Sequence, residues 1–439
     1  MTQLLDLPPE LFQNIVHELN AESPNSTWKL RGVCRTFAAE IEHDLLSNQC
    51  ERVVEEMYEV INNNIAKYLL IRLNRPSDIN NRLLKMLRSM ADYLVRELAI
   101  PKEERKGTET GMVEGFVRVC HPGHIRHLMS GNSAHASEFR QSLGNMDNSA
   151  ELQYWQKVVA AMAIQAFDLM RTLLAEMPRN VWVRGTTIGD GPLVMAVRSE
   201  DDGLFDAVMD HLNHLGKTAK REVEGQYNYH FDDAFHIAVD TGSTRFAEEL
   251  VEFRQTIVHR VSKKSYNQWL NVGIARLNTD IVKLVLLLNP SGEKVNSFLF
   301  TRACRTGSID MVNTLLNEGE LNVNAGTFMT RPLFRAIKLG DIPIIGAVLD
   351  AGADIDAEVD RRRGMFPRGT CSPMEVAFDR GDKALLEFFM SRGATMPPQD
   401  DWPTRKKLYT MVREVAIANG STNVPTYRRW CNLEEGESE

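Results

Sequence analysis

A helical unit repeats along much of this chain, and residues 330–357 contain its clearest copy. Pro332 begins a short helix at the first-turn position, where a missing N–H costs nothing, and Gly340 ends it. A second apolar pattern at helical spacing follows and closes at Gly352, where a left-handed backbone conformation is needed. Two such short helices bury too little surface to offset the entropy of ordering about 33 residues, so neighbouring copies must stack on them.

The other copies are found by aligning the small residue that stands four positions before each turn. Eight and nine positions after each small residue comes a pair of apolar residues that belongs to the second helix of the unit. The aligned small residues, called anchors below, are Ala161, Ala196, Ala238, Gly273, Ala303, Ala336 and Ala377. The spacings of 35, 42, 35, 30, 33 and 41 residues between them indicate a common period with two insertions. The sequence therefore predicts seven repeats.

Residues of about 150–398 resemble an ankyrin-repeat array. The segment from Thr330 to Ala336, T-R-P-L-F-R-A, stands where that family shows T-P-L-H-x-A. The resemblance is clear over 296–398 and more divergent before 296, where several copies lack the turn glycine. An ordinary helical bundle is the alternative, but a bundle does not produce a fixed period. The resemblance implies an all-α solenoid that binds a protein partner.

The N-terminal segment carries a second pattern. Residues 4–19 read L-L-D-L-P-P-E-L-F-Q-N-I-V-H-E-L, in which Leu11, Ile15 and Leu19 recur every four residues and predict a short amphipathic helix. A polar loop at 20–25 and a second helix containing W-x-L-R-x-V-C-R-x-F are expected after it.

This combination resembles the F-box. The residues that fall on the family's pattern are Leu7, Pro8, Glu10, Leu11, Ile15, Leu19, Leu30, Arg31, Val33, Cys34, Arg35 and Phe37. In F-box proteins the module binds the Skp-type adaptor of a cullin–RING ubiquitin ligase. The adaptor-binding residues implied by the resemblance are Leu7, Pro8, Glu10, Leu11, Ile15, Leu19, Leu30, Val33, Cys34 and Phe37.

An independent physical argument also favours a partner. A module of about 40 residues with this many apolar side chains cannot hide all of them within itself, so part of its surface is expected to be an interface. The alternative is that residues 4–46 form a hairpin that docks on the helices downstream of it.

The predicted domains are an F-box at 1–46, a helical linker region at 47–149, the repeats at 150–398, and a capping helix with an acidic tail at 399–439. Within the linker region, the segment 101–115 is rich in charge, threonine and glycine, and 130–149 is polar without an apolar period. Both segments are expected to be flexible loops.

Charge and cysteine usage limit the functional class. The net charge of -8 and the absence of a large basic face disfavour binding to nucleic acid. Six scattered cysteines without a C-x-x-C pair suit reduced thiols in the cytoplasm or nucleus. The N-terminus lacks the basic-then-apolar order of a secretory signal, and the longest apolar run is too short to span a membrane. A cytoplasmic or nuclear protein that binds neither nucleic acid nor membrane is expected.

Catalytic and metal-binding motifs give little signal. Cys120, His121, His124 and His127 form the only cluster that suggests a metal, but a Pro-Gly step interrupts it and no second ligand pair at zinc spacing lies nearby. A metal-dependent enzyme built on this cluster is therefore disfavoured against ordinary surface or packed histidines. Motifs of nucleotide-binding proteins, zinc proteases and serine hydrolases are absent from the sequence. We therefore expect a protein that is not an enzyme and has no cofactor.

One insertion suggests where a substrate would bind. Residues 358–370 add about eight residues between two repeats, and insertions in a solenoid emerge on one face. Arg361, Arg362, Arg363 and Phe366 are therefore candidates for contact with an acidic, partly apolar protein, the alternative being an idle surface loop.

Together, the two resemblances imply a substrate-recognition subunit of an SCF-type ubiquitin ligase. Its F-box would bind the Skp-type adaptor and through it a cullin, while the ankyrin array would bind a protein substrate that the sequence does not identify. In joining an F-box to a divergent ankyrin array, the chain is similar to a group of fungal proteins. The competing class is an ankyrin scaffold or sequestering protein that acts without a ligase.

Overall fold

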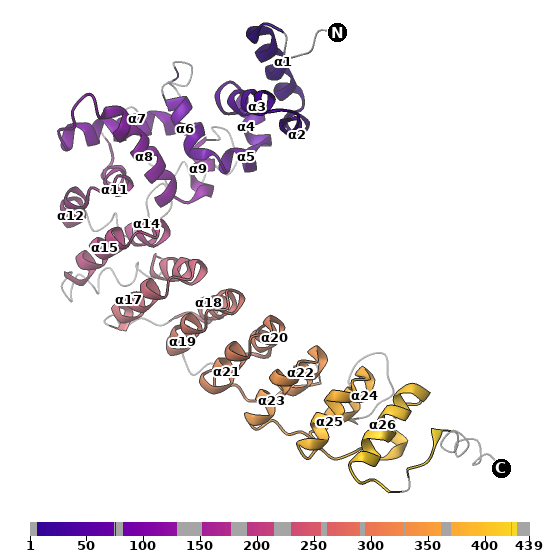
Figure 1. The fold of residues 1–439 in the computed structure, drawn as a ribbon. Helices are drawn as coiled ribbons and strands as arrows, with labels where there is room; N and C mark the ends of the chain where they lie inside the picture. The colour runs from indigo at the N-terminus through magenta and orange to yellow at the C-terminus, as the bar shows by residue number, and fades with distance from the viewer. Residues whose placement is uncertain are drawn as a thin grey trace. The chain divides into compact units, whose positions relative to one another are not determined.

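The structure is a computed structural model that describes residues 7–73, 75, 82–129, 152–176, 191–214, 230–255, 261–289, 295–328, 330–360, 370–422 and 424–427. Helices dominate these residues, which confirms the all-α class (Figure 1). The only strands among them are β1 (Val359–Asp360) and β2 (Thr370–Cys371), which pair antiparallel with Val359 opposite Cys371. The chain divides into two compact units, Met1–Ile237 with Phe253–His259 and Ala238–Glu252 with Arg260–Glu439.

The first unit begins with two longer helices that are separated by two short helical segments. They are α1 (Pro9–Glu22), α2 (Pro24–Lys29), the 3-10 helix η2 (Leu30–Gly32) and α3 (Arg35–Ser47). The expected polar loop at 20–25 is wrong, because α1 continues to Glu22 and Pro24 already occupies the first turn of α2. The second helix that we expected is broken in two, because Cys34 has an extended backbone and acts as the N-cap of α3.

The linker helices follow, and one of them lies where we expected a loop. They are α4 (Glu51–Glu56), α5 (Tyr58–Asn62), α6 (Ile65–Leu73), α7 (Arg82–Glu97), α8 (Arg105–Val119) and α9 (Pro122–Met129). The expected loop at 101–115 is wrong from residue 105 onward, because α8 is a helix that buries Met112, Val113 and Phe116. The other segment expected to be flexible, 130–149, lies outside the described residues.

Gly115 is one reason why a loop was wrongly predicted for residues 105–115. A Cβ atom added to Gly115 would lie 1.8 Å from the backbone oxygen of Ala163, the last residue of α11 (Tyr154–Ala163). The glycine therefore permits a close approach between two helices, which is a different use of glycine from the turn that its local sequence predicts.

Seven helix pairs follow in the described ranges, at the places that the anchor spacing predicts. In the first unit they are α11 (Tyr154–Ala163) with α12 (Phe167–Glu176), and α14 (Pro192–Ser199) with α15 (Asp202–His214). Helix 230–241 and α17 (Thr244–Gln255) come next and contribute residues to both units. The second unit continues with α18 (Lys263–Ala275) and α19 (Thr279–Leu287), α20 (Ser297–Thr306) and α21 (Ile309–Glu318), α22 (Pro332–Leu339) and α23 (Ile342–Asp350), and α24 (Pro373–Arg380) and α25 (Lys383–Ser391).

All seven anchors are buried, and the residue four positions after each anchor has a left-handed backbone. The left-handed residues are Gln165, Glu200, Gly242, Leu277, Gly307, Gly340 and Gly381. The copies that lack a turn glycine therefore make the same turn with glutamine, glutamate or leucine. A left-handed conformation costs a residue with a Cβ roughly 1–2 kcal/mol, so stacking must stabilise these three turns against local strain.

The residue after each left-handed position usually caps the second helix. Side-chain oxygens of Asp201, Ser243, Asn278, Ser308, Asp341 and Asp382 accept a hydrogen bond from the backbone N–H three residues later. Each such cap contributes about 1 kcal/mol to helix stability. The turn and the cap together define the angle at which the two helices of a pair meet.

Equivalent helices of neighbouring pairs pack on each other within the second unit. The first helices α18, α20, α22 and α24 form one row and the second helices α19, α21, α23 and α25 another (Figure 1). The capping helix, expected at 401–419, is α26 (Lys406–Ala418), and it packs on α24 and α25 after a 3-10 turn η4 (Gln399–Asp401). In the first unit α7 and α8 pack on α11, so the linker covers the first helix pair instead of forming a separate domain.

The left-handed turn at Leu277 gives a testable consequence. Leu277 has φ of 59° and its side chain is 53% exposed, so little packing opposes its replacement. We predict that Leu277→Gly raises the free energy of unfolding by about 0.5–1 kcal/mol, because the relief of strain exceeds the entropy that glycine adds to the unfolded chain. Urea unfolding followed by circular dichroism measures this change.

Leu277→Ala is the matched control, since alanine keeps the Cβ and therefore the strain. Its stability is expected to stay within about 0.5 kcal/mol of the unsubstituted protein. Equal stabilisation by alanine and glycine would show that backbone strain at residue 277 is not the cause.

Candidate partner-binding surfaces

The N-terminal module, residues 7–47, has a small core of its own. Phe12 and Val16 of α1 pack with Phe37 and Ile41 of α3, and all four are at most 7% exposed. The rings of Phe12 and Phe37 meet edge to face with centroids 5.2 Å apart. Burial of each such side chain stabilises the fold by about 1.5–3 kcal/mol, so this core is sufficient to hold α1 against α3.

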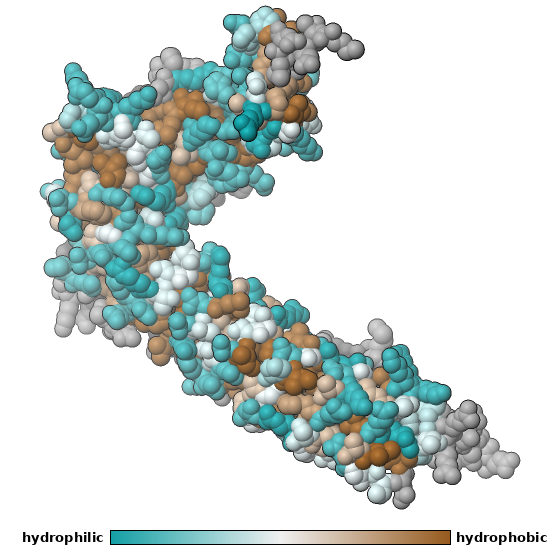
Figure 2. Space-filling model, in the orientation of Figure 1, coloured by the Kyte–Doolittle hydropathy of each residue, from teal (hydrophilic) through white to brown (hydrophobic). Residues whose placement is uncertain are grey.

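A second apolar stripe on α1 remains at the surface. Leu11 is 52% exposed, and Ile15 and Leu19, which follow it at four-residue intervals, are only partly buried. Leu30 and Val33 add further exposed apolar area, at 39% and 67%. Apolar residues of this module are visible at its surface in Figure 2. The stripe that the sequence predicted as the apolar face of α1 is therefore the face left available to a partner.

Of the ten predicted adaptor-binding residues, nine are exposed or partly buried and one lies in the core. The exposed residues are Pro8, Glu10, Leu11, Leu30 and Val33, and the partly buried ones are Leu7, Ile15, Leu19 and Cys34. Phe37 is the exception, because its ring lies in the core against Phe12. Phe37 therefore supports the module from within and does not belong to its surface.

The break between η2 and α3 brings Val33 to the surface. The sulfur of Cys34 accepts a hydrogen bond from the backbone N–H of Phe37 at 3.5 Å and so caps α3. On the other side of the break, the guanidinium of Arg31 lies 3.4 Å from the centroid of the Trp28 ring. This cation–π contact orders the short segment before Val33.

A buried polar cluster holds α1 and α3 in register beneath the exposed stripe. Asp44 of α3 is 1% exposed and accepts a hydrogen bond at 2.9 Å from the side-chain amide of Asn20 in α1. The amide of Gln49 donates to the same carboxylate oxygen of Asp44, and Nδ1 of His17 lies 2.9 Å from the other oxygen. Because a buried carboxylate is costly without partners, these contacts require one relative position of the two helices.

The pKa of Asp44 reflects this environment. Burial alone would raise the pKa of the carboxyl, but hydrogen bonds from Asn20, Gln49 and His17 outweigh burial and hold it below its ordinary value of 3.8. The ionised form is therefore the one that the folded module prefers.

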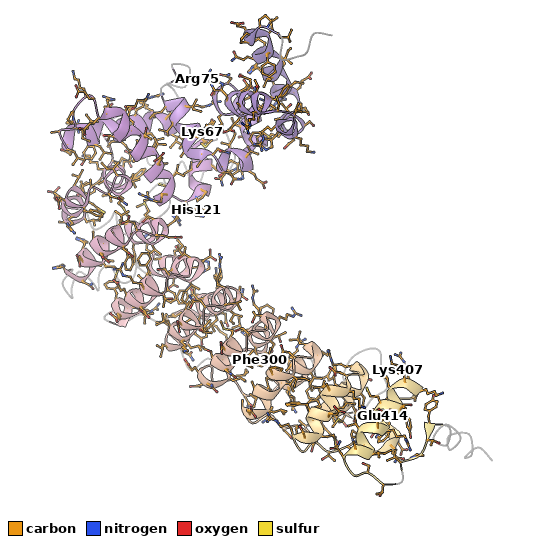
Figure 3. All side chains as sticks on the ribbon, in the orientation of Figure 1. Lys67, Arg75, His121, Phe300, Lys407 and Glu414 are labelled. Atoms are coloured by element: carbon orange, nitrogen blue, oxygen red, sulfur yellow. The ribbon has the colours of Figure 1, made fainter. Side chains whose placement is uncertain are left out.

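The module also docks on α6, the third helix after it. Arg72 of α6 is 9% exposed and donates hydrogen bonds to the backbone oxygens of Leu46 and Gln49, at 3.1 and 2.5 Å. Arg75 donates to the backbone oxygen of Ser47, and Lys67 pairs with Glu42 (Figure 3 labels Arg75 and Lys67). These contacts involve the C-terminal part of α3 and leave the stripe on α1 uncovered.

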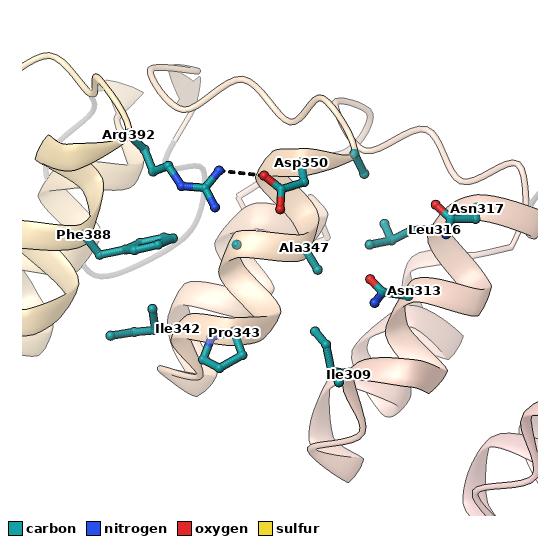
Figure 4. A pocket seen from close by; sticks show the side chains of 12 residues that line it. Ile309, Asn313, Leu316, Asn317, Ile342, Pro343, Ala347, Asp350, Phe388 and Arg392 are labelled. Atoms are coloured by element: carbon teal, nitrogen blue, oxygen red, sulfur yellow. Dashed lines mark hydrogen bonds and ion pairs between the residues drawn. The ribbon is translucent and has the colours of Figure 1, made fainter.

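A second candidate surface is a groove on the second helices of the other unit (Figure 4). Its walls carry Ile309 of α21 and Ile342 of α23, and the ring of Phe388 of α25 stands at one end. Asp350 and Arg392 form an ion pair of 2.6 Å at the rim. Both side chains of this pair are more than a third exposed, so the pair adds little stability.

Other residues singled out in the sequence are not brought together. Arg361, Arg362, Arg363 and Phe366 lie outside the described residues. Cys120 is buried and His121 is exposed, with Nδ1 of His121 accepting the backbone N–H of Gly123 (Figure 3 labels His121). The side chains of His124 and His127 are not described, and within the described part of the chain no three His, Cys, Asp or Glu side chains gather as a metal site.

The sequence contained a signal for the buried polar cluster that we did not use. Asn20 stands eight residues after Phe12 and four after Val16, so it continues the buried stripe of α1. A polar residue at the end of an apolar stripe indicates a buried hydrogen-bonding partner. The partners within the cluster are Asp44 and Gln49. They could not be predicted from the sequence, because their position depends on how α3 packs against α1.

Comparison with models of known protein families gives no match, and comparison with curated proteins gives none. No helix in the described ranges is both long enough and apolar enough to cross a membrane.

The Asp44 cluster predicts sensitivity of the module to acid. Because the folded-state pKa lies below the unfolded value, the stability that Asp44 contributes is complete above pH 3.8 and is lost as the pH falls through the lowered pKa. Hydrogen exchange of the α1 and α3 amides, corrected for intrinsic rates, should therefore show weaker protection at about pH 3 than at about pH 6.

Asp44→Asn tests the cause of this loss. The amide cannot accept as many hydrogen bonds, so the module should lose about 1–3 kcal/mol at neutral pH and show less further loss in acid. An unchanged pH dependence in this variant would show that other carboxylates carry the effect.

Proposed function

We propose that this protein is a substrate-recognition subunit of a cullin–RING ubiquitin ligase. In this proposal the N-terminal module is an F-box that binds a Skp-type adaptor, and the helix pairs form an ankyrin array that binds a protein substrate. The protein itself performs no chemistry. It holds substrate lysines near a ubiquitin-conjugating enzyme and so raises their effective concentration.

The exposed apolar residues of the module, Leu11 on α1 and Val33 between η2 and α3, are the observation that carries the proposal. The module already has a core in Phe12, Val16, Phe37 and Ile41, so Leu11 and Val33 are not needed for folding. Exposed apolar side chains at 52% and 67%, next to a rigid core, are typical of residues that a partner covers. They occupy positions that match the F-box pattern.

The repeats support the second half of the proposal. Seven buried anchors, each followed four residues later by a left-handed turn, match the helix–turn–helix unit of ankyrin repeats. Stacked units of this kind present extended surfaces on which a protein can bind. A cytoplasmic or nuclear location, which the reduced-thiol composition favours, suits this role.

One observation favours the competing function, an ankyrin scaffold without a ligase. The hydrogen bonds from Arg72 and Arg75 to the end of α3 dock the module on its own downstream helix, as a purely structural hairpin would. Deletion of residues 1–46 would therefore disturb α6 as well as remove the proposed interface. Point substitutions at the exposed residues Leu11 and Val33 separate the two functions better.

We predict that the double substitution Leu11→Asp and Val33→Asp abolishes binding of a Skp-type adaptor and leaves the helical content and unfolding midpoint unchanged. The reason is that two charges would be desolvated at the interface, whereas both side chains face water in the free protein. Pull-down from a cell extract with mass spectrometry of adaptor and cullin peptides measures the result.

Leu287→Asp is the matched control, since Leu287 is 75% exposed but lies on α19 in the other unit. It should retain the adaptor. Recovery of the adaptor with the Leu11 and Val33 variant would refute the proposed interface. If a pull-down with the unsubstituted protein recovers neither adaptor nor cullin, the scaffold function is favoured.

A further inference from the structure

A basic face lies on the first helices of two adjacent repeats, α20 and α22, which pack on each other. Counted from the anchors Ala303 and Ala336, position −1 is arginine in both helices, and position +2 is also basic in both. The residues are Arg302 and Arg305 on α20, and Arg335 and Lys338 on α22, with Arg331 as the N-cap of α22. Because their offsets from the two anchors are equal, these residues lie at equivalent positions along the axes of the two neighbouring helices.

All four arginines of this face lack an acidic partner in the part of the chain that the structure describes. Within the described residues, no carboxylate forms an ion pair with Arg302, Arg305, Arg331 or Arg335, whereas other surface cations of this unit do form pairs. Moreover, the Nε atoms of Arg331 and Arg335 are buried without a hydrogen-bond partner. Both residues are only partly buried, so the other nitrogens of each guanidinium remain able to donate to an acceptor from outside the fold.

The lysine of this face is partly desolvated and stands near a like charge. Burial and the nearby charge of Arg335 lower the pKa of Lys338, whose ammonium also lies 4.6 Å from the centroid of the Phe328 ring. Like charges held close together raise the free energy of the folded state, and a bound anion relieves that repulsion.

The surroundings limit the size and chemistry of the ligand. On one side α24 carries Glu375 and Asp379, so the basic face does not continue there except through Arg380, which donates to the backbone oxygen of Lys338 at 2.6 Å. Exposed Phe298, at 67%, lies one turn before Arg302 on the same side of α20. A face two helices wide measures about 10 Å, the length of about three extended residues.

We propose that the α20–α22 basic face binds a short acidic segment of a partner protein that also carries an apolar side chain, with Phe298 contacting the apolar residue. A nucleic acid fits less well, because the basic area is short and the whole chain has a net charge of -8. If the partner is a substrate, this inference rests on the proposed receptor function. Binding of the acidic segment itself does not depend on the adaptor.

The test uses the full-length chain and a fluorescein-labelled peptide of about ten residues, made of glutamate with one central phenylalanine. Fluorescence anisotropy should show binding that weakens with added salt, because surface charges are screened over about 8 Å at physiological ionic strength. The double substitution Arg302→Glu and Arg335→Glu should weaken binding by at least about tenfold. Phe298→Ala should weaken binding of this peptide but not of an all-glutamate peptide.

Lys406→Glu with Lys407→Glu is the matched control, because it changes the net charge equally at exposed residues of α26 (Figure 3 labels Lys407). The control should bind the peptide as the unsubstituted protein does. Arg305→Glu, at an exposed position, provides a second variant if the Arg302 and Arg335 variant fails to fold. Equal weakening in the control would mean that net charge alone attracts the peptide and would overturn the site.

Two further outcomes would overturn the proposal. One is unchanged peptide binding in both arginine variants. The other is tight binding of a labelled thymidine oligonucleotide of about ten nucleotides with no binding of the peptide. The Leu11 and Val33 variant should bind the peptide normally, so failure of the basic face and failure of the adaptor interface are distinguished.

Discussion

The close approach of neighbouring helices at a small residue is the constraint on which the repeats depend. A buried alanine or glycine at each anchor lets the next helix pack closely, and the left-handed residue four positions later turns the chain back. Leu277, Glu200 and Gln165 adopt the same turn despite having a Cβ. Stacking therefore dominates over local preference, because the burial of a whole helix face outweighs roughly 1–2 kcal/mol of strain.

The N-terminal module depends on a different balance. Its apolar core is small, and the buried carboxylate of Asp44, with Asn20 and Gln49 as donors, adds a requirement for one register between α1 and α3. A hydrophobic core alone tolerates sliding, whereas a buried charge with directed hydrogen bonds does not. This rigidity keeps Leu11 and Val33 exposed in a defined arrangement, which favours binding because little conformational entropy remains to be lost.

Both proposed interfaces consist of groups that the fold leaves without partners. On the module they are apolar side chains outside a complete core, and on α20 and α22 they are arginines that form no ion pair with a described carboxylate. The two surfaces differ in chemistry, so one protein can hold an apolar partner and an acidic partner without competition between them. The groove beside Phe388 lacks such a signature, because its charged rim residues already pair with each other.

The helical class and the seven anchors could be predicted from local spacing, and four of the turns from their glycines, whereas Gln165, Glu200 and Leu277 turn without one. The sequence misassigned 105–115 as a loop, since Gly115 serves a contact with Ala163 that local composition does not encode. The folded structure was needed to show which stripe of α1 is buried, that Phe37 lies in the core, and that the arginines of α20 and α22 lie together without an ion pair among the described residues. These outcomes depend on contacts between residues distant in the chain, and periodicity alone specifies which residues share a face but not what that face meets.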